Sequence, residues 1–406
     1  DSGATLPVNF RRKQLKTLKR LVRENEEAIL KALQLDLGKP VFEAYATEIG
    51  YLLEEIGFVS DHLEEWAQPK LVETPLMYWP SGSYIHYQPK GVVLIISPWN
   101  YPFQLALSPL IPALAAGNTA FIKPSEQTPY TARLIEKLIE KYFDPQYVTV
   151  VQGDGAELVP ELINNYGFNH IFFTGSVPVG KEIAKLAAPH LIPVTLELGG
   201  KSPCVVDETA NLKVAAQRIA LGKWINAGQT CIAPDYLLLQ ESIADKFLEQ
   251  LKKTITAFFG DDPVHHKQYT QMVHEKHFNK QLDYLKEAEV IYGGESSKAT
   301  RKIAPTLVKA KMESSLMQEE IFGPILPFLT YKTQEEAREI IAHNPDPLAM
   351  YIFSTKRATQ EYFIEHIRFG GGMVNGTIMY LGNPSLPFGG VGNSGIENYH
   401  GLQGFL

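Results

Sequence analysis

A carboxylate and a thiol, each close to glycine, are the side chains of this chain whose types and spacing best suit chemistry. Glu197 ends the apolar run Val194-Thr195-Leu196 and is followed by Leu198-Gly199-Gly200-Lys201. Cys231 follows the polar turn Gly228-Gln229-Thr230. A thiolate is a nucleophile, and a carboxylate whose pKa is raised by apolar surroundings can take a proton from water. The pair predicts an enzyme that works through a covalent thioester.

Both residues also have an ordinary structural interpretation. Free cysteines are more often small core residues than nucleophiles, which is what we expect of Cys204 within Pro203-Cys204-Val205-Val206. The polar, glycine-bearing context of Cys231 favours the nucleophile instead. Because only the thiolate attacks, we expect the site to lower the pKa of this thiol or to place a base nearby. The alternative for Glu197 is a salt bridge at the end of a strand.

A third candidate is Asn100, which lies between Trp99 and Tyr101-Pro102. Its side-chain amide can donate a hydrogen bond to a developing oxyanion. The alternative is an asparagine in an ordinary turn, which is the more common case for an isolated residue.

Two segments have the character of a nucleotide site. Gly175-Ser176-Val177-Pro178-Val179-Gly180-Lys181 follows a predicted strand and opens a predicted helix, where glycines and free N–H groups suit a pyrophosphate. The pattern is looser than G-x-G-x-x-G, so a simple glycine turn stays an equal alternative. Lys123 and Glu126 follow the neighbouring strand and can hydrogen-bond ribose hydroxyls, with a surface ion pair as their alternative.

Short apolar runs separated by helical stretches must position these residues. Residues 92–96, 119–123, 148–151 and 170–173 have the pattern of strands buried on both faces, and strand–helix alternation predicts a parallel sheet. Ligands bind such sheets at the carboxyl ends of the strands. A second α/β stretch runs from about residue 197 to 377, and residues 83–87 alternate like an exposed strand.

The bulk properties exclude several classes of protein. A chain of 406 residues is too long for one core, so we expect two or three domains. The net charge of -7 and the lack of a long basic block argue against nucleic-acid binding. Two cysteines outside any metal-ligand spacing indicate a reducing compartment, hence a cytoplasmic protein without a metal site. We interpret His274-Glu275-Lys276-His277 as surface polarity, and no apolar run reaches the ~20 residues of a membrane span, so membrane attachment is not evident.

Taken together, segments over nearly the whole chain resemble the aldehyde dehydrogenase superfamily. Cys231-Ile232-Ala233-Pro234-Asp235-Tyr236 and the stretch from Pro387 to Gly395 look specifically like its class 3 branch, which acts on fatty and aromatic aldehydes. The ordered segments that carry the wider resemblance are Pro98-Trp99-Asn100-Tyr101-Pro102, Lys123-Pro124-Ser125-Glu126, Phe173-Thr174-Gly175-Ser176, Leu196-Glu197-Leu198-Gly199-Gly200-Lys201, Gly228-Gln229-Thr230-Cys231 and Glu320-Ile321-Phe322-Gly323-Pro324.

The resemblance implies a role for each matching position. Cys231 would be the nucleophile, Glu197 the base that activates the deacylating water, and Asn100 an oxyanion donor together with the Cys231 backbone N–H. The cofactor would be NAD, with NADP also accepted. Its binding residues would be Trp99 beside the cofactor, Lys123 and Glu126 at the adenosine ribose, Gly175, Ser176 and Gly180 at the pyrophosphate, Glu320 at the nicotinamide ribose and Phe322 near the nicotinamide.

The resemblance also implies an α/β fold in three parts and a homodimer. We expect a Rossmann-like NAD(P)-binding domain from residues 1–79 and 91–196 and an α/β catalytic domain from residues 197–377. A small β oligomerisation arm would come from residues 80–90 and 378–406, its C-terminal part incomplete because the chain stops at Gly404-Phe405-Leu406. Val177-Pro178 departs from the usual pyrophosphate turn, which puts the tightness of diphosphate binding in question.

Three functions follow, in order of preference. The first is NAD(P)-dependent oxidation of an apolar aldehyde, medium- or long-chain aliphatic or aromatic, to the carboxylic acid. The second is a coenzyme-A-acylating aldehyde dehydrogenase, which Glu197 argues against because that base serves hydrolysis. The third is a non-catalytic binding or structural homologue, which the complete set of Cys231, Glu197 and Asn100 argues against. Because Glu126 would repel a 2′-phosphate, we expect NAD to be preferred over NADP.

Overall fold

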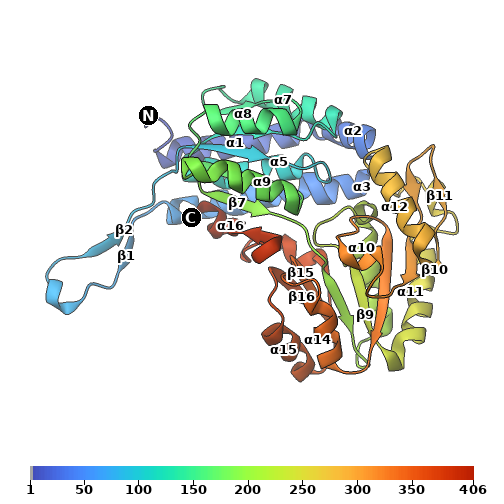
Figure 1. Ribbon diagram of the computed structural model, residues 1–406. Helices are drawn as coiled ribbons and strands as arrows, with labels where there is room; N and C mark the ends of the chain where they lie inside the picture. The colour runs from blue at the N-terminus through green and yellow to red at the C-terminus, as the bar shows by residue number, and fades with distance from the viewer. Residues whose placement is uncertain (1–2) are drawn as a thin grey trace.

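The structure is a computed structural model and describes residues 3–406. Two main sheets lie side by side, each wrapped by helices, and a thin hairpin projects from the first (Figure 1). The first sheet has six strands, which are, in order across it, β17 (Gly395–Ile396), β7 (Val194–Glu197), β6 (His170–Thr174), β3 (Val92–Ile96), β4 (Thr119–Lys123) and β5 (Val148–Val150). All neighbours are parallel except β17, which runs antiparallel to β7. The predicted parallel sheet is therefore confirmed.

Helices cover both faces of this sheet because its strands are apolar on both sides. Val93, Ile95 and Ile122 join the core formed with α1, α4 and α6, whereas Leu94 and Ile171 face α8 and α9. The helices of this half are α1 (Val8–Glu24), α2 (Glu26–Leu37), α3 (Val41–Ala44), a π-helical turn at Tyr45–Ile49, α4 (Gly50–Trp66), α5 (Gln104–Leu107), α6 (Leu110–Ala116), α7 (Pro129–Tyr142), α8 (Gly155–Asn165) and α9 (Val177–Ala187).

The second sheet has seven strands and supplies the other half of the site. Across it they are β10 (Glu289–Tyr292), β13 (Thr306–Lys309), β14 (Ile325–Tyr331), β9 (Tyr236–Gln240), β8 (Pro203–Val206), β15 (Ala349–Phe353) and β16 (Gly371–Val374). The strands are parallel except for β10. Around it lie α10 (Leu212–Trp224), α11 (Ala244–Phe259), α12 (Glu275–Glu287), α13 (Ser315–Gln318), α14 (Gln334–Ala342), α15 (Arg357–His366) and the small pair β11 (Ser296–Ser297) and β12 (Lys302–Ile303).

The projecting hairpin and the C-terminal tail lie in different places. The hairpin consists of β1 (Lys70–Val72) and β2 (Ser83–Ile85) and extends well beyond the body of the molecule (Figure 1). Its tip exposes large apolar side chains, among them Leu76 and Met77 at 84% and 80% exposure. The tail instead adds β17 to the first sheet and packs α16 (Gly401–Phe405) against α4 and α6.

Candidate active site

The candidate residues from the six-stranded sheet lie at or just after the ends of its strands, along one edge of that sheet. Asn100 comes shortly after β3, Lys123 ends β4, Gly175 follows β6, and Glu197 ends β7. Because β3, β4, β6 and β7 are parallel, their carboxyl ends share this edge. The tertiary structure thus collects four segments that the sequence separates widely.

Cys231 reaches the same edge from the second half. It lies between the tight turn Ile225–Gly228 and β9, and Asn226 and Ala227 adopt left-handed backbone at φ 51° each. The thiol is partly exposed. Desolvation first, then the carboxylates of Glu320 and Glu197, raise the pKa of Cys231 well above its usual range. The charge of Glu197 therefore acts on the Cys231 thiol.

The predicted ways of activating the thiol therefore have different outcomes. The expectation of a lowered pKa is wrong for Cys231, because desolvation and then the negative charges of Glu320 and Glu197 raise it. Glu197, whose charge acts on the thiol, stays the predicted candidate for the nearby base. Cys204, by contrast, is fully buried in β8 as predicted for a core residue.

Glu197 is a buried carboxylate without compensation in the described part of the chain. It is 3% exposed, and neither carboxylate oxygen has a hydrogen-bond partner there. Desolvation raises its pKa well above the usual range. The alternative of a strand-end salt bridge is wrong, since such a pair would satisfy at least one oxygen. This environment suits a group that accepts a proton from water or substrate better than it suits a salt bridge.

Asn100 is held against the loop that carries Cys231. Its Nδ2 donates to the carbonyl oxygen of Gln229 at 3.1 Å, and the side chain is 3% exposed. Next to it, the Tyr101 and Thr230 hydroxyls are 2.7 Å apart. An amide nitrogen has two N–H groups, so the bond to Gln229 leaves the second for a ligand.

The cofactor-binding candidates form a polar edge with open hydrogen-bonding capacity. Lys123 pairs with Glu126, which lowers the pKa of that carboxyl despite its partial burial. The buried hydroxyls of Ser97, just after β3, and Thr174, at the end of β6, have no partner among residues 3–406. Buried polar groups in native proteins rarely lack a hydrogen-bond partner. These hydroxyls therefore fit a site that a polar ligand such as a dinucleotide completes.

The glycine turn after β6 leaves no room for side chains. A Cβ at Gly175 would collide with the Phe173 ring, and one at Gly180 with Leu198. Ser176 precedes the first residue of α9, and its side chain makes no capping hydrogen bond. The first turn of α9 therefore presents free N–H groups and the positive end of the helix dipole, which suits a diphosphate.

Glu320 and Phe322 lie on a loop opposite, next to the strand β14. The Glu320 carboxyl lies against Gly199, and burial raises its pKa to about 8. Phe322 has left-handed backbone and its ring is 5.3 Å from that of Trp99. The charge of Glu320 also raises the pKa of the Cys231 thiol, so this loop with both cofactor candidates lies near Cys231.

The two histidines of residues 274–277, interpreted above as surface polarity, are partly buried and contact predicted cofactor residues. His277 Nε2 donates to the Phe322 carbonyl oxygen at 2.7 Å, and the His277 ring is 5.6 Å from that of Trp99. His274 also packs on Trp99 at 6.2 Å. Because a carbonyl only accepts, His277 carries its proton on Nε2, and burial lowers its pKa to about 4. No sequence signal distinguished these histidines from a polar helix start.

Two buried lysines were given no role at the sequence level. Lys201 pairs with Asp235 and donates to the carbonyls of Leu316 and Glu319 at 2.7 and 3.0 Å. Lys223 is 0% exposed, its ammonium has no hydrogen-bond partner in the described chain, and burial lowers its pKa to about 8. Lys201 lies in the segment that follows Glu197, so its closeness to a candidate residue could have marked it in the sequence. Lys223 is one polar residue in a helical run, and its sequence context did not mark it.

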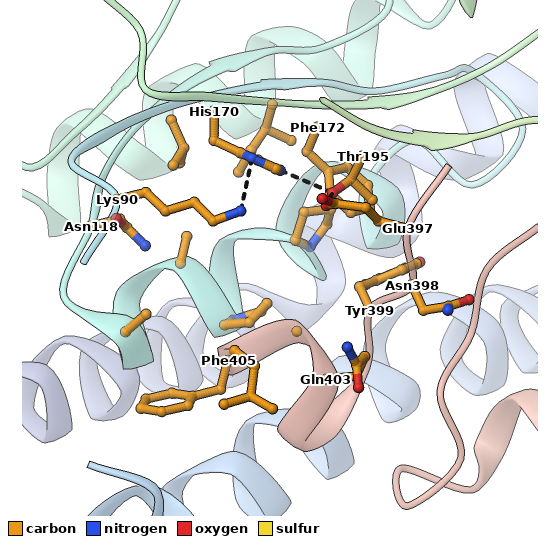
Figure 2. A pocket seen from close by; sticks show the side chains of 18 of the residues that line it. Lys90, Asn118, His170, Phe172, Thr195, Glu397, Asn398, Tyr399, Gln403 and Phe405 are labelled. Carbon is orange, nitrogen blue, oxygen red and sulfur yellow. Dashed lines mark hydrogen bonds between the residues drawn. The ribbon is translucent and has the colours of Figure 1, made fainter. Parts of the chain in front are cut away.

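A separate cavity of about 370 Å³ lies away from this edge, toward the amino ends of β3 and β6. Figure 2 shows His170 between Lys90 and Thr195, with Thr195 against Glu397. Residues 403–406 line the other side. Desolvation, and then Lys90, lower the pKa of His170 to about 4. None of the predicted catalytic or cofactor residues lines this cavity.

No helix within residues 3–406 is both long enough and apolar enough to cross a bilayer.

Comparisons with known proteins agree with the geometry of the edge. The model of the aldehyde dehydrogenase family matches residues 2–406. The chain is 48% identical over 408 residues to 4,4'-diaponeurosporen-aldehyde dehydrogenase of Staphylococcus aureus, covering 100% of this chain and 88% of the relative. It is 43% identical to the dimeric NADP-preferring aldehyde dehydrogenase of Canis lupus familiaris, covering 100% of this chain and 89% of the relative.

A solved structure supports the same assignment. The substrate-bound state of Staphylococcus aureus AldH superposes with a TM-score of 0.97 at 48% identity, over 99% of this chain and 88% of that chain. Sequence family, close relatives and fold agree, and the predicted resemblance to class 3 enzymes is confirmed. The chain is an NAD(P)-dependent oxidoreductase acting on aldehydes and belongs to the aldehyde dehydrogenase family.

Proposed function

We propose that this enzyme oxidises apolar aldehydes to carboxylic acids through a thioester on Cys231. The observation that carries the proposal is the convergence of Cys231, Glu197 and Asn100 on one edge, from both halves of the fold. A nucleophile, an unpaired buried carboxylate and an amide donor together meet the needs of acyl chemistry.

Each of the three side chains has a separate task in this mechanism. The thiol of Cys231 loses its proton and Sγ bonds to the aldehyde carbon, so the carbonyl oxygen becomes an oxyanion. The second N–H of Asn100 Nδ2 and the Cys231 backbone N–H donate to that oxygen. Oxidised NAD(P), when bound, would accept the hydride that leaves this carbon, so that a thioester on Cys231 remains. Glu197 then accepts a proton from water, which attacks the thioester carbon; the C–S bond breaks, the acid leaves and the Cys231 sulfur is freed.

The raised pKa values give Glu197 a second use. Because the pKa of the Cys231 thiol lies above its usual range, the thiol holds its proton in the free enzyme at neutral pH. The pKa of Glu197 is raised as well, so its carboxylate is a stronger base than an exposed one. Glu197 is thus suited to accept the thiol proton before it activates water.

The cofactor residues support NAD, with NADP as a second cofactor. Lys123, Glu126 and the α9 N-terminus would hold adenosine ribose and diphosphate, and Glu320 the nicotinamide ribose. The Glu126 carboxylate would repel a 2′-phosphate, whereas a relative is named NADP-preferring. Michaelis constants for the two cofactors decide this, and a lower constant for NADP would contradict the preference.

Aromatic side chains near the thiol support an apolar substrate. The Tyr101 hydroxyl is 2.7 Å from that of Thr230, and the Tyr351 hydroxyl donates to the Ile232 carbonyl at 2.5 Å, so both bind neighbours of Cys231. The Tyr380 ring is 6.5 Å from that of Tyr351, and all three tyrosines are at most 9% exposed. Such rings favour an apolar or aromatic aldehyde over a charged one. The relative named for 4,4'-diaponeurosporen-aldehyde points the same way. Aldehydes of increasing chain length would show kcat/KM rising with apolar length, and a preference for short polar aldehydes would contradict the proposal.

The central experiment replaces the nucleophile. Cys231→Ala should abolish NAD(P) reduction with hexanal or benzaldehyde, while Cys204→Ala, the matched control in the buried strand β8, should retain it. Undiminished turnover of Cys231→Ala would refute the mechanism. Formation of acyl-CoA in preference to the acid on adding coenzyme A would favour the acylating alternative.

We also propose that the β1–β2 hairpin takes part in a homodimer. Its exposed Leu76, Met77 and Trp79 are unusual for a solvated hairpin, and one relative is named dimeric. Sedimentation of a variant with Leu76, Met77 and Trp79 changed to serine should show a weakened dimer, and an unchanged sedimentation profile would contradict this role.

A further inference from the structure

A fully buried ion pair holds the backbone of Asn100 from behind. Lys39, just after α2, and Glu48, in the π-helical turn, are both 0% exposed in their side chains, and Lys39 Nζ is 2.5 Å from Glu48 Oε1. The same ammonium donates to the carbonyl oxygen of Asn100 at 3.2 Å and lies 4.2 Å from the centre of the Tyr101 ring. The ammonium therefore has a partner for each N–H direction: a carboxylate, the Asn100 carbonyl and an aromatic face.

The second oxygen of Glu48 fixes the chain just beyond Asn100. Glu48 Oε2 accepts the backbone N–H groups of Phe103 at 3.0 Å and Gln104 at 3.1 Å. These N–H groups belong to the start of α5, where they lack partners within the helix. One ion pair thus ties down both ends of the segment from Asn100 to Gln104.

A third charged residue of the same region holds the opposite side of the Cys231 loop. Glu43 Oε1 accepts the backbone N–H of Asn226 and the Thr270 hydroxyl, each at 3.0 Å. Asn226 Nδ2 in turn donates to the carbonyls of Asn100 at 2.9 Å and Gln229 at 3.1 Å. The Asn100 carbonyl therefore receives two hydrogen bonds, from Lys39 and from Asn226.

Burial of the Lys39–Glu48 ion pair is best explained by its effect on the position of the backbone, not by a gain in stability. A buried ion pair gains little stability over apolar residues of the same shape, because removing both charges from water offsets their attraction. Its directional bonds do, however, specify where the attached backbone lies. The backbone that it holds here carries the amide we assign to the oxyanion, and shifts of about 1 Å in such groups cost about 100-fold in rate.

We propose that Lys39 and Glu48 are positioning residues for oxyanion stabilisation, acting through the backbone of Asn100. The inference rests on the oxyanion role of Asn100 proposed above. It predicts that the pair affects kcat more than the KM for aldehyde, because the oxyanion forms in the transition state and not in the bound substrate.

The test is a double-mutant cycle with kcat and KM measured for hexanal. Lys39→Met should lower kcat by about 10- to 100-fold with little change in KM. In an Asn100→Ala background the same substitution should lower kcat by less than about threefold, because the group it positions is gone. Glu48→Gln, which keeps the shape of the side chain, should act in the same direction and serves if Lys39→Met fails to fold.

Asp36→Asn is the matched structural control. Asp36 is also a buried carboxylate that accepts backbone N–H groups at a helix start, those of Tyr130 at 3.2 Å and Thr131 at 2.7 Å in α7. It should lower the melting temperature without a comparable loss of kcat. Equal losses of kcat in Asp36→Asn and Lys39→Met, or a full effect of Lys39→Met in the Asn100→Ala background, would overturn the inference. A fully active Asn100→Ala would instead overturn the oxyanion role itself, and the inference with it.

Discussion

Replacing Glu55 should stabilise this protein progressively as the pH rises. Glu55, in α4, is 3% exposed; Ser108 donates to its Oε2 at 2.6 Å, whereas Oε1 has no partner among the described residues. Desolvation raises its pKa from 4.5 to about 8, and the hydrogen bond from Ser108 opposes this only in part. Desolvation first, with the charge of Glu55 among the lesser causes, also raises the pKa values of Tyr51 and Tyr399.

The sign and size follow from proton linkage. Between pH 4.5 and about 8 the unfolded chain has lost this proton while the folded chain retains it, so stability falls as pH rises through that window. The difference of about 3.5 between the two pKa values, at about 1.4 kcal/mol per pKa unit, gives a total of about 5 kcal/mol above pH 8. The same linkage gives about 1 kcal/mol at pH 5 and about 3 kcal/mol at pH 7.

Glu55→Gln removes the charge and keeps the shape, so its advantage over the wild type should grow by about 4 kcal/mol between pH 5 and pH 9. Urea unfolding of both proteins at pH 5, 7 and 9, followed by circular dichroism, measures this. Glu249→Gln is the control of opposite sign, because Lys252 at 2.8 Å lowers the pKa of that exposed carboxyl, and its loss should cost stability at pH 9. A difference between Glu55→Gln and wild type that stays constant with pH would refute the reasoning.

Three further changes test the active edge. Glu197→Gln should lower steady-state kcat by at least about 100-fold and also slow the burst of reduced cofactor, because Glu197 is assigned both the thiol proton and the water proton; a burst at the wild-type rate would contradict the first of these roles. Gly199→Ala should raise the KM for NAD by about tenfold or more, because its Cβ would displace the Glu320 carboxylate; an unchanged KM would exclude contact between Glu320 and the cofactor. His277→Leu, which removes the bond to the Phe322 carbonyl, should raise the KM for NAD about tenfold without changing that for aldehyde, and equal effects on both would point to general misfolding.

Local patterns in the sequence were enough for the elements and for the chemical types. Residues 92–96 are apolar throughout and residues 119–123 have an apolar centre, and they form the largely buried strands β3 and β4. The difference between Cys204 and Cys231 was also readable from their neighbours, because an apolar run and a polar glycine turn impose different environments. Strand periodicity and turn chemistry depend on adjacent residues, so they can be predicted from the order of residues alone.

The charges and the partners of these residues were decided by the tertiary structure. The pKa of Cys231 rises because folding desolvates the thiol and then because Glu320 and Glu197 act on it from other segments. His277 contacts the site through a carbonyl that lies 45 positions away. Lys39 reaches the Asn100 carbonyl across 61 positions. Desolvation and Coulomb interactions depend on distance in space, which the order of residues does not specify. The sequence by itself therefore determined which groups are capable of the chemistry, and only the folded arrangement decided their protonation and geometry.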